Sequence, residues 1–258
     1  YLLFFMSTNK IIYNTIEFLN WSQRSKLLEE EKILIQEYLI KNLNTLEAGT
    51  AGGRILLEMK QLGFNSLYGF DFVESFIDEA RRKDKDNKVN FTVQDATNLN
   101  YAEESFDQAI YMQQILSSIE DPLKREMALK ESYRILKKGG TIIFSFLSFN
   151  SKKKSALSKL FFLHLLLIRF LTKNKSSIQF LPWLKHADKI NWSSLWDKGP
   201  YNYWFKTDEV FKLLEDVGFS IISIGYPTQI LGNCMHTSYK TLKAKYGDGH
   251  IYFVCKKP

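Results

Sequence analysis

Hydrophobic and polar positions follow two different periods along this chain. Between residues 11 and 43, apolar residues recur at helical spacing, as at Ile12, Ile16 and Leu19. From residue 44 onwards, short apolar runs alternate with helical patterns, and this alternation predicts a parallel sheet with helices on both faces. The predicted strands cover 44–48, 66–70, 89–94, 108–112 and 141–146, and the predicted helices between them cover 54–62, 73–83 and 122–137.

The alternation stops at Asn150 and resumes at Thr207. A helix over 207–217 and strands over 219–225 and 250–256 then complete the pattern, so we expect one α/β domain with an insertion after the fifth strand. The predicted parts are an N-terminal helical cap (1–43), a ligand-binding core (44–149), the insertion (150–206) and the C-terminal part of the core (207–258).

A glycine cluster follows the first predicted strand, in Leu46-Glu47-Ala48-Gly49-Thr50-Ala51-Gly52-Gly53-Arg54. Glycines at a strand-to-helix turn let the backbone approach a ligand closely. No lysine follows Gly53 as a phosphate-binding P-loop requires, and the spacing is not that of the dinucleotide fingerprint. A carboxylate at Glu47 would repel a phosphate but attract an ammonium or sulfonium group, which indicates a cationic nucleoside.

Two further acids follow the next two predicted strands. Asp71 ends the second strand, where it can accept hydrogen bonds from ribose hydroxyls, and the adjacent Phe72 can pack on an adenine ring. Asp95, followed by Ala96, ends the third strand and offers an acceptor to an exocyclic amine. One such acid alone is usually a helix cap. Three acids at successive strand ends of one sheet favour a ligand site.

With these pieces in order, the chain resembles the class I S-adenosylmethionine-dependent methyltransferases. The resemblance also includes Ser105-Phe106-Asp107 and Arg134-Ile135-Leu136-Lys137-Lys138-Gly139-Gly140. It implies a Rossmann-like, seven-stranded, mostly parallel sheet with an antiparallel last strand and a helical lid after strand five. It also implies S-adenosylmethionine as cofactor, with the glycine loop at the methionine part, Asp71 at the ribose and Asp95 with Ala96 at the adenine. The predicted cofactor contacts are Glu47, Gly49, Thr50, Ala51, Gly53, Asp71, Phe72, Asp95, Ala96, Met112 and Gln113.

The chain departs from the family pattern in two places. Ala51 stands where the family usually has its middle glycine, which is expected to tighten the pocket or weaken binding. The segment after strand four, Met112-Gln113-Gln114-Ile115-Leu116-Ser117-Ser118, lacks the histidine pair of many relatives, so a base carried there elsewhere is absent. His164, His186 and His236 are the other candidate bases. None of them is distinguished by the sequence, and the catalytic residues stay unassigned.

The charge is concentrated in the insertion. The chain carries a net charge of +7, and residues 150–206 hold eleven Lys and Arg against two Asp, a net charge of +9.

Two cysteines cannot form a disulfide framework, no metal-ligand spacing is present, and the apolar run at residues 1–5 is too short for a signal peptide. We therefore expect a cytoplasmic protein without a metal.

The insertion is also rich in aromatic residues, which favours a bulky, partly apolar acceptor beneath it. Tyr13, Trp21 and Arg24 of the cap are candidate lid contacts. Within the insertion, Leu160–Leu171 would form a helix about 18 Å long, too short for the ~30 Å hydrocarbon core of a membrane. This stretch, within 155–175, could be a lid helix, a peripheral contact with an anionic membrane, or a dimer contact.

The leading hypothesis is methyl transfer to oxygen or nitrogen of a small-molecule or peptide-like metabolite. An RNA methyltransferase that uses the basic insertion is one alternative, although the aliphatic run argues against a polar RNA-binding stripe. The other alternative is a non-catalytic protein of this fold that binds a partner through its insertion, with Ala51 marking a lost site.

Overall fold

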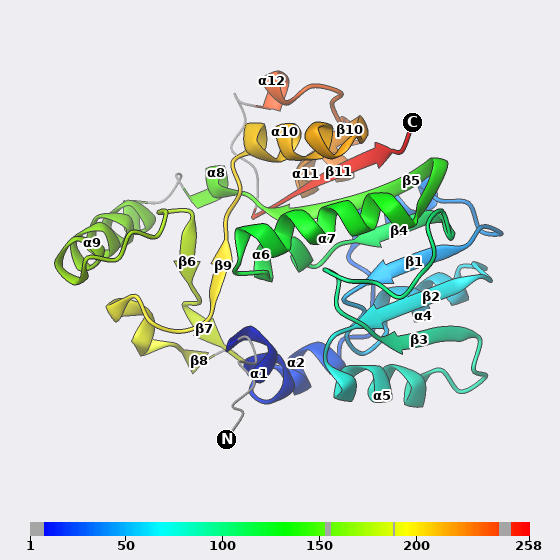
Figure 1. Ribbon diagram of the computed structural model, residues 1–258, viewed down its shortest axis with the longest axis horizontal. Coiled ribbons are helices and arrows are strands. Elements are labelled where there is room, and N and C mark those ends of the chain that lie inside the picture. The colour runs from blue at the N-terminus through cyan, green and yellow to red at the C-terminus, as the bar shows by residue number, and fades with distance from the viewer. Residues whose placement is uncertain (1–7, 153–155, 188, 243–248) are drawn as a thin grey trace.

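The computed structural model describes residues 8–152, 156–187, 189–242 and 249–258. Its centre is a seven-stranded sheet made of β1 (Thr45–Ala48), β2 (Leu67–Asp71), β3 (Val89–Val93), β4 (Phe106–Tyr111), β5 (Leu136–Leu147), β10 (Ser220–Gly225) and β11 (His250–Lys256). The strand order is β10-β11-β5-β4-β1-β2-β3 (Figure 1). Only β11 runs antiparallel to its two neighbours in this sheet. The Rossmann-like sheet with an antiparallel last strand is therefore confirmed.

Helices bury both faces of the sheet. One face packs against α3 (Glu29–Tyr38), α4 (Arg54–Gln61), α5 (Glu74–Lys83) and the short α11 (Pro227–Leu231), through a core that includes Leu34, Leu56 and Ile77. The other face packs against α7 (Pro122–Ile135) and α10 (Thr207–Val217), through a core that includes Leu129 and Leu214. Two short helices, α6 (Ile115–Ser118) and α12 (Tyr239–Leu242), complete the core.

Most element bounds lie within two residues of those predicted, and α10 and β11 agree exactly. The helix predicted over 122–137 ends earlier, at Ile135, and β5 begins at the next residue. Gly139 and Gly140 lie inside this strand, where Gly139 takes a φ of +73° and donates its N–H to the Lys257 carbonyl at 2.8 Å. The helical pattern of the cap divides into α1 (Thr8–Asn14), α2 (Phe18–Ser22) and α3.

The insertion is only partly helical. It contains α8 (Phe149–Lys152), α9 (Ala156–Thr172), the antiparallel strand pairs β6 (Phe180–Pro182) with β9 (Tyr201–Tyr203) and β7 (Lys185–His186) with β8 (Lys189–Ile190), and a 3-10 helix, η1 (Trp192–Trp196). Lys153, Lys154 and Asp188, which contribute to the charge of the insertion, lie outside the described residues. The apolar run at residues 1–5 lies outside them as well.

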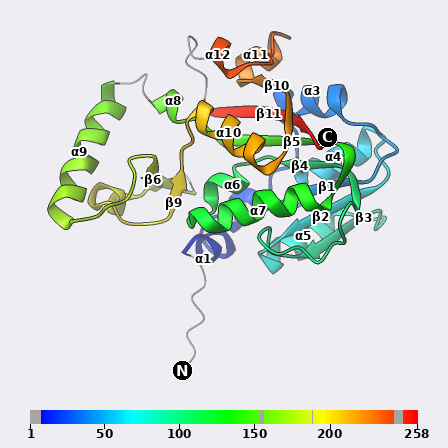
Figure 2. The ribbon, with the colours of Figure 1, turned by 45° about the horizontal axis from the view of Figure 1, so that its top comes forward.

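The parallel strands direct their carboxyl ends toward α1, α2 and the insertion (Figure 1). In a second orientation, α9 still stands on the outer side of the insertion, away from the sheet (Figure 2). In sheets of this type, ligands bind outside the carboxyl ends of the strands. The fold therefore places the cap and the insertion around the expected ligand position.

Candidate active site

A cavity of about 310 Å³ lies at the carboxyl ends of β1, β2 and β3. The cap closes it with Asn9 and Tyr13 of α1, Trp21 of α2 and the following Arg24. Tyr13, Trp21 and Arg24 are the candidate lid contacts of the cap, and all three line this cavity. Nine of the eleven predicted cofactor contacts line this cavity: Glu47, Gly49, Thr50, Ala51, Asp71, Phe72, Asp95, Ala96 and Gln113.

The other two predicted contacts, Gly53 and Met112, do not line it. Gly53 is the residue before α4, with a φ of +79°, and a Cβ there would lie 3.0 Å from the Phe91 ring and 3.1 Å from the Ala80 Cβ. Its lack of a side chain therefore serves the packing of α4 against α5 and β3. The Met112 side chain is buried in the core on the α3 and α4 face of the sheet.

The glycine loop is shaped for close approach. Gly49 has a φ of +61°, and a Cβ at this position would lie 2.0 Å from Cδ1 of Ile115. Gly52 is packed against the cap, because a Cβ there would lie 2.5 Å from the Ser22 carbonyl oxygen. Ala51 adopts a φ of 46°, in the left-handed region that glycine enters at lower cost. The loop thus keeps the turn that the missing glycine would allow, and it does so with a strained alanine.

Two buried carboxylates face this loop. The Glu47 carboxylate accepts a hydrogen bond from the Thr50 hydroxyl at 2.6 Å. The Asp71 carboxylate accepts the backbone N–H groups of Ala51 and Val73, each at 3.0 Å. Asp71 thereby links the second strand to the glycine loop and to the residue before α5.

Burial sets the protonation of both groups. Loss of hydration raises the pKa of Glu47 to about 7, although the Thr50 hydroxyl and Arg54 oppose this rise. Burial likewise raises the pKa of Asp71 to about 6, against hydrogen bonds from the backbone. A ligand that brings a cation or hydroxyl donors would compensate both carboxylates. Asp95 differs, since its side chain is exposed and accepts the N–H and hydroxyl of Thr97 at 2.9 and 2.8 Å.

The turn after β4 holds Gln113, a predicted cofactor contact, next to Gln114, for which the sequence indicated no role. Gln113 and Gln114 have φ values of 58° and 69°, and two consecutive left-handed residues other than glycine are unusual. The Gln113 amide donates to Glu31 of α3, which also forms a buried ion pair with Arg54 at 2.6 Å. The Gln114 amide lies 2.9 Å from Nε2 of His250. Neither the left-handed backbone of these two residues nor their contacts with residues distant in the chain could be recognised from the local sequence.

A second cavity, of about 520 Å³, adjoins the first. The two share Tyr13 and Trp21 as lining residues, and the Tyr13 ring lies edge-on to those of Trp21 and Trp183, at 6.3 and 5.4 Å between centroids. The insertion provides most of the remaining wall. Its lining residues include Lys152, Leu157, Phe161, Phe162, Leu181, Trp183, Asn202 and Trp204, together with Glu17 of the loop between α1 and α2 and Gln114.

Three candidate bases lie elsewhere. His164 of α9 hydrogen-bonds the Leu195 carbonyl through Nε2, at 2.7 Å, and the backbone of His236 pairs with that of Ile224. His186 packs its ring near that of Trp183. Among the described residues that line the two cavities, none is a histidine. The described residues also contain no group of His, Cys, Asp and Glu arranged to hold a metal ion.

Comparison with known proteins agrees with this architecture. Residues 46–144 match a family model described as a methyltransferase domain. No curated protein matches the chain in sequence.

Several solved structures share the fold. A SAM-dependent methyltransferase from Methanosarcina mazei has a TM-score of 0.66 and 20% identity, over 90% of this chain and 98% of that one. A SAM-dependent methyltransferase from Thermotoga maritima, described as a possible histamine N-methyltransferase, has a TM-score of 0.54 and 21% identity, over 97% and 93%. The [4+2]-cyclase SpnF has a TM-score of 0.61 and 15% identity, over 97% and 96%. These likenesses define the fold alone, and one fold can carry different chemistry.

The family match covers the stretch that contains the glycine loop and all three acids. Residues 46–144 therefore form a methyltransferase domain with the class I fold, and S-adenosylmethionine is the cofactor.

Proposed function

We propose that this enzyme methylates an oxygen or nitrogen atom of a small-molecule or peptide-like metabolite that is bulky and partly apolar. The observation that carries this proposal is the second cavity, which meets the first at Tyr13 and Trp21 and is walled by aromatic residues of the insertion. Its volume of about 520 Å³ lies in the range typical of small-molecule sites. Residues 150–206 thus form the acceptor lid, and residues 1–43 cap the cofactor.

The residues of the first cavity suit the cofactor. The loop from Gly49 to Ala51, with Glu47 behind it, is proposed to hold the methionine part. Asp71 is proposed to bind the ribose hydroxyls, with Phe72, Asp95 and Ala96 at the adenine. Gln113 closes the cavity beside Glu31. Gly53 and Met112 are proposed to support this site through packing, because neither lines it.

S-adenosylmethionine supplies a methyl group already activated by its sulfonium, so the chain's task is to align the two reactants and exclude water. Alignment can lower a barrier by about 7–11 kcal/mol in favourable cases. Tyr13 lies where the two cavities meet, and burial raises the pKa of its hydroxyl, which keeps the phenol protonated. Tyr13 is therefore a neutral wall of the passage between donor and acceptor, and it does not act as a base.

Two unpaired polar atoms belong to residues that line the second cavity. Trp183 Nε1, a donor, and Asn202 Oδ1, an acceptor, are buried without a hydrogen-bond partner among the described residues. Unpaired buried polar atoms are costly, so a polar partner supplied to either atom by a bound acceptor would stabilise the complex. Lys152 lies 4.0 Å from the Trp204 ring centroid, and burial lowers the pKa of its amine. An acceptor with a flat apolar body and polar groups for Trp183 and Asn202 fits this wall.

A methyl-transfer assay with labelled donor tests the proposal against a panel of phenols, aromatic amines, apolar amino acids and short peptides. We expect turnover of at least one bulky compound, with the KM for that acceptor raised in Trp183→Phe and Asn202→Leu. The affinity for S-adenosylhomocysteine should stay unchanged in both variants, since neither residue lines the first cavity. Turnover of RNA alone, with binding that weakens steeply in salt, would contradict the proposal.

A further inference from the structure

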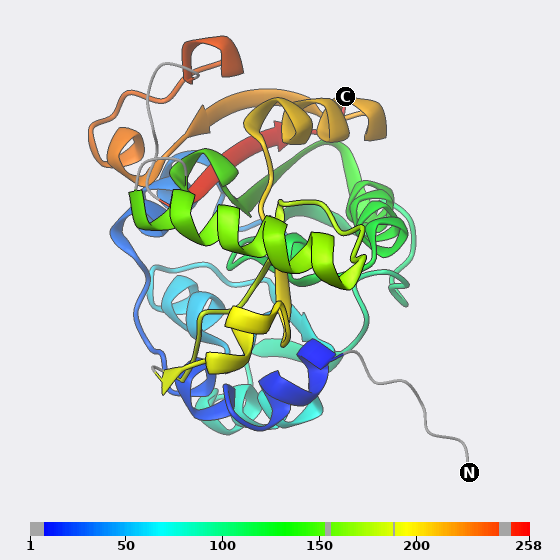
Figure 3. The ribbon, with the colours of Figure 1, turned by 90° about the vertical axis from the view of Figure 1, so that its left-hand side faces the viewer.

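The outer surface of the insertion is unusually apolar. Large hydrophobic side chains of α9 are exposed along a stripe at spacings of three and four residues: Leu157, Leu160, Leu163, Leu167 and Phe170. Phe170 is 81% exposed. A helix that is hydrophobic on all sides is normally buried, and a contiguous exposed apolar patch usually marks an interaction site. Figure 3 shows α9 across the near face of the molecule, with η1 beside it.

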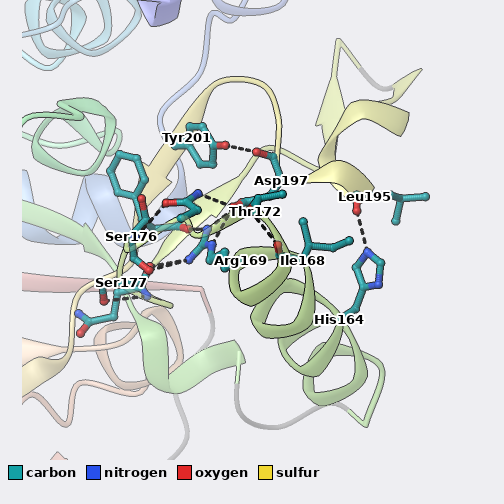
Figure 4. Close-up of polar contacts among 12 residues, drawn as sticks. His164, Ile168, Arg169, Thr172, Ser176, Ser177, Leu195, Asp197 and Tyr201 are labelled. Atoms are coloured by element: carbon teal, nitrogen blue, oxygen red, sulfur yellow. Dashed lines mark hydrogen bonds and ion pairs between the residues drawn. The ribbon is translucent and has the colours of Figure 1, made fainter.

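A buried ion pair holds η1 against α9. The Arg169 guanidinium of α9 donates to both Asp197 carboxylate oxygens at 2.8 Å, and both side chains are almost fully buried. The same guanidinium donates to the carbonyls of Ser177 and Phe180 at 2.7 and 2.6 Å (Figure 4). This arrangement fixes the position of η1, whose Trp192 and Trp196 are 69% and 67% exposed. The apolar face is therefore a rigid surface made of two elements.

The exposed charged side chains that the structure describes on the insertion are all positive. Lys159 lies on α9, Lys173 and Lys175 follow its end, and Lys189 and Lys198 flank η1, and all five side chains are exposed. Among the described residues of the insertion, no acidic side chain is exposed, because Asp197 is buried in its ion pair. A second copy placed on this face would bring like charges together.

From these observations we propose that α9 and η1 form a docking surface for an anionic lipid bilayer. The apolar stripe would enter the interfacial region, the two tryptophans would lie at headgroup depth, and the lysines would face the anionic headgroups. No helix of the described residues is long and apolar enough to cross a membrane, so this contact is peripheral. Leu157 is both part of the stripe and part of the wall of the second cavity, so that cavity lies beside the docked surface.

Sedimentation of the full chain with phosphatidylcholine vesicles, with and without phosphatidylserine, tests this proposal. We expect binding to the anionic vesicles that decreases with salt. Leu163→Glu and the double variant Lys173→Glu with Lys175→Glu should each reduce binding more than about tenfold. Leu231→Glu is the matched control, because Leu231 is a 54% exposed leucine on α11 that lines neither cavity, and it should bind as the wild type does.

We expect the affinity for S-adenosylhomocysteine to be unchanged in every variant. This control would show that each variant is folded, and it keeps a loss of vesicle binding distinct from a loss of methyl transfer. Four outcomes would overturn the proposal. The wild type could fail to bind anionic vesicles, or bind neutral and anionic vesicles equally. Light scattering could instead show a dimer that Leu163→Glu dissociates, in which case the face joins two copies. Finally, the lysines could confer salt-sensitive binding to RNA and none to vesicles.

Discussion

At the scale of single residues, the site depends on carboxylates that burial keeps partly protonated. The pKa values of Glu47 and Asp71, about 7 and about 6, lie above their ordinary values of 4.5 and 3.8. Burial in the folded, unliganded protein therefore shifts both groups toward their uncharged forms. A cationic ligand at Glu47 reverses this preference, and the same groups then contribute to binding.

These shifts predict two opposite pH dependences. Without ligand, the raised pKa values contribute stability that is fully present below the unfolded values of 3.8 and 4.5 and is lost as pH rises from there through the folded values of about 6 and 7. The free energy of unfolding should therefore fall over that range. The affinity for S-adenosylmethionine should instead rise about tenfold between pH 6 and pH 8, as the carboxylates ionise. Calorimetry across pH measures both, and an affinity in Glu47→Gln with the same pH dependence as the wild type would contradict this interpretation.

Gly49 provides a second test at this scale. In Gly49→Ala, the new Cβ meets Ile115 and the residue keeps a φ of +61°, so we expect a loss of roughly 1–2 kcal/mol of stability from the backbone alone, plus weaker cofactor binding. Gly139→Ala is the matched control, because Gly139 has a φ of +73° and nothing lies within 4 Å of the added Cβ. Chemical denaturation that shows equal losses in the two variants would mean that contact with Ile115 has no cost.

At the scale of elements, the insertion depends on the ion pair between α9 and the residue after η1. Arg169→Met leaves Asp197 buried with Asn174 as a remaining side-chain partner, so we expect a loss of about 3–5 kcal/mol in the free energy of unfolding. Lys130→Met is the control, since it breaks an exposed ion pair with Glu126 worth roughly 0–1 kcal/mol. Similar small losses in both variants would show that η1 does not depend on Arg169.

The elements of the core could be predicted from sequence because each is encoded by nearby residues. The period of apolar positions and the glycines at Gly63 and Gly218 fix where strands and helices alternate. The structure of the insertion depends instead on contacts between residues far apart in the chain. Strand β6 pairs with β9, and Arg169 pairs with Asp197. Nothing local in that segment distinguishes a short strand pair from an irregular lid, so only its apolar helix could be foreseen.

At the scale of the whole molecule, the site residues that could be predicted are those placed by the strand pattern, and the others are placed by contacts between distant parts of the chain. Acids at strand ends converge because parallel strands end at one edge, so Glu47, Asp71 and Asp95 could be placed together from sequence. The second cavity could not be predicted, since Tyr13, Lys152 and Trp204 meet only after the cap and the insertion fold against each other. The packing roles of Gly53 and Met112 likewise depend on tertiary neighbours.

The central claim is that the cavity around Glu47 and Asp71 binds S-adenosylmethionine, and calorimetric titration tests it most directly. We predict binding of S-adenosylmethionine and S-adenosylhomocysteine to the wild type, and loss of both in Asp71→Ala. Leu231→Glu, which alters an exposed position on α11 that lines neither cavity, should bind both ligands normally. A folded wild type that binds neither ligand, or an Asp71→Ala variant that binds as tightly as the wild type, would contradict the account.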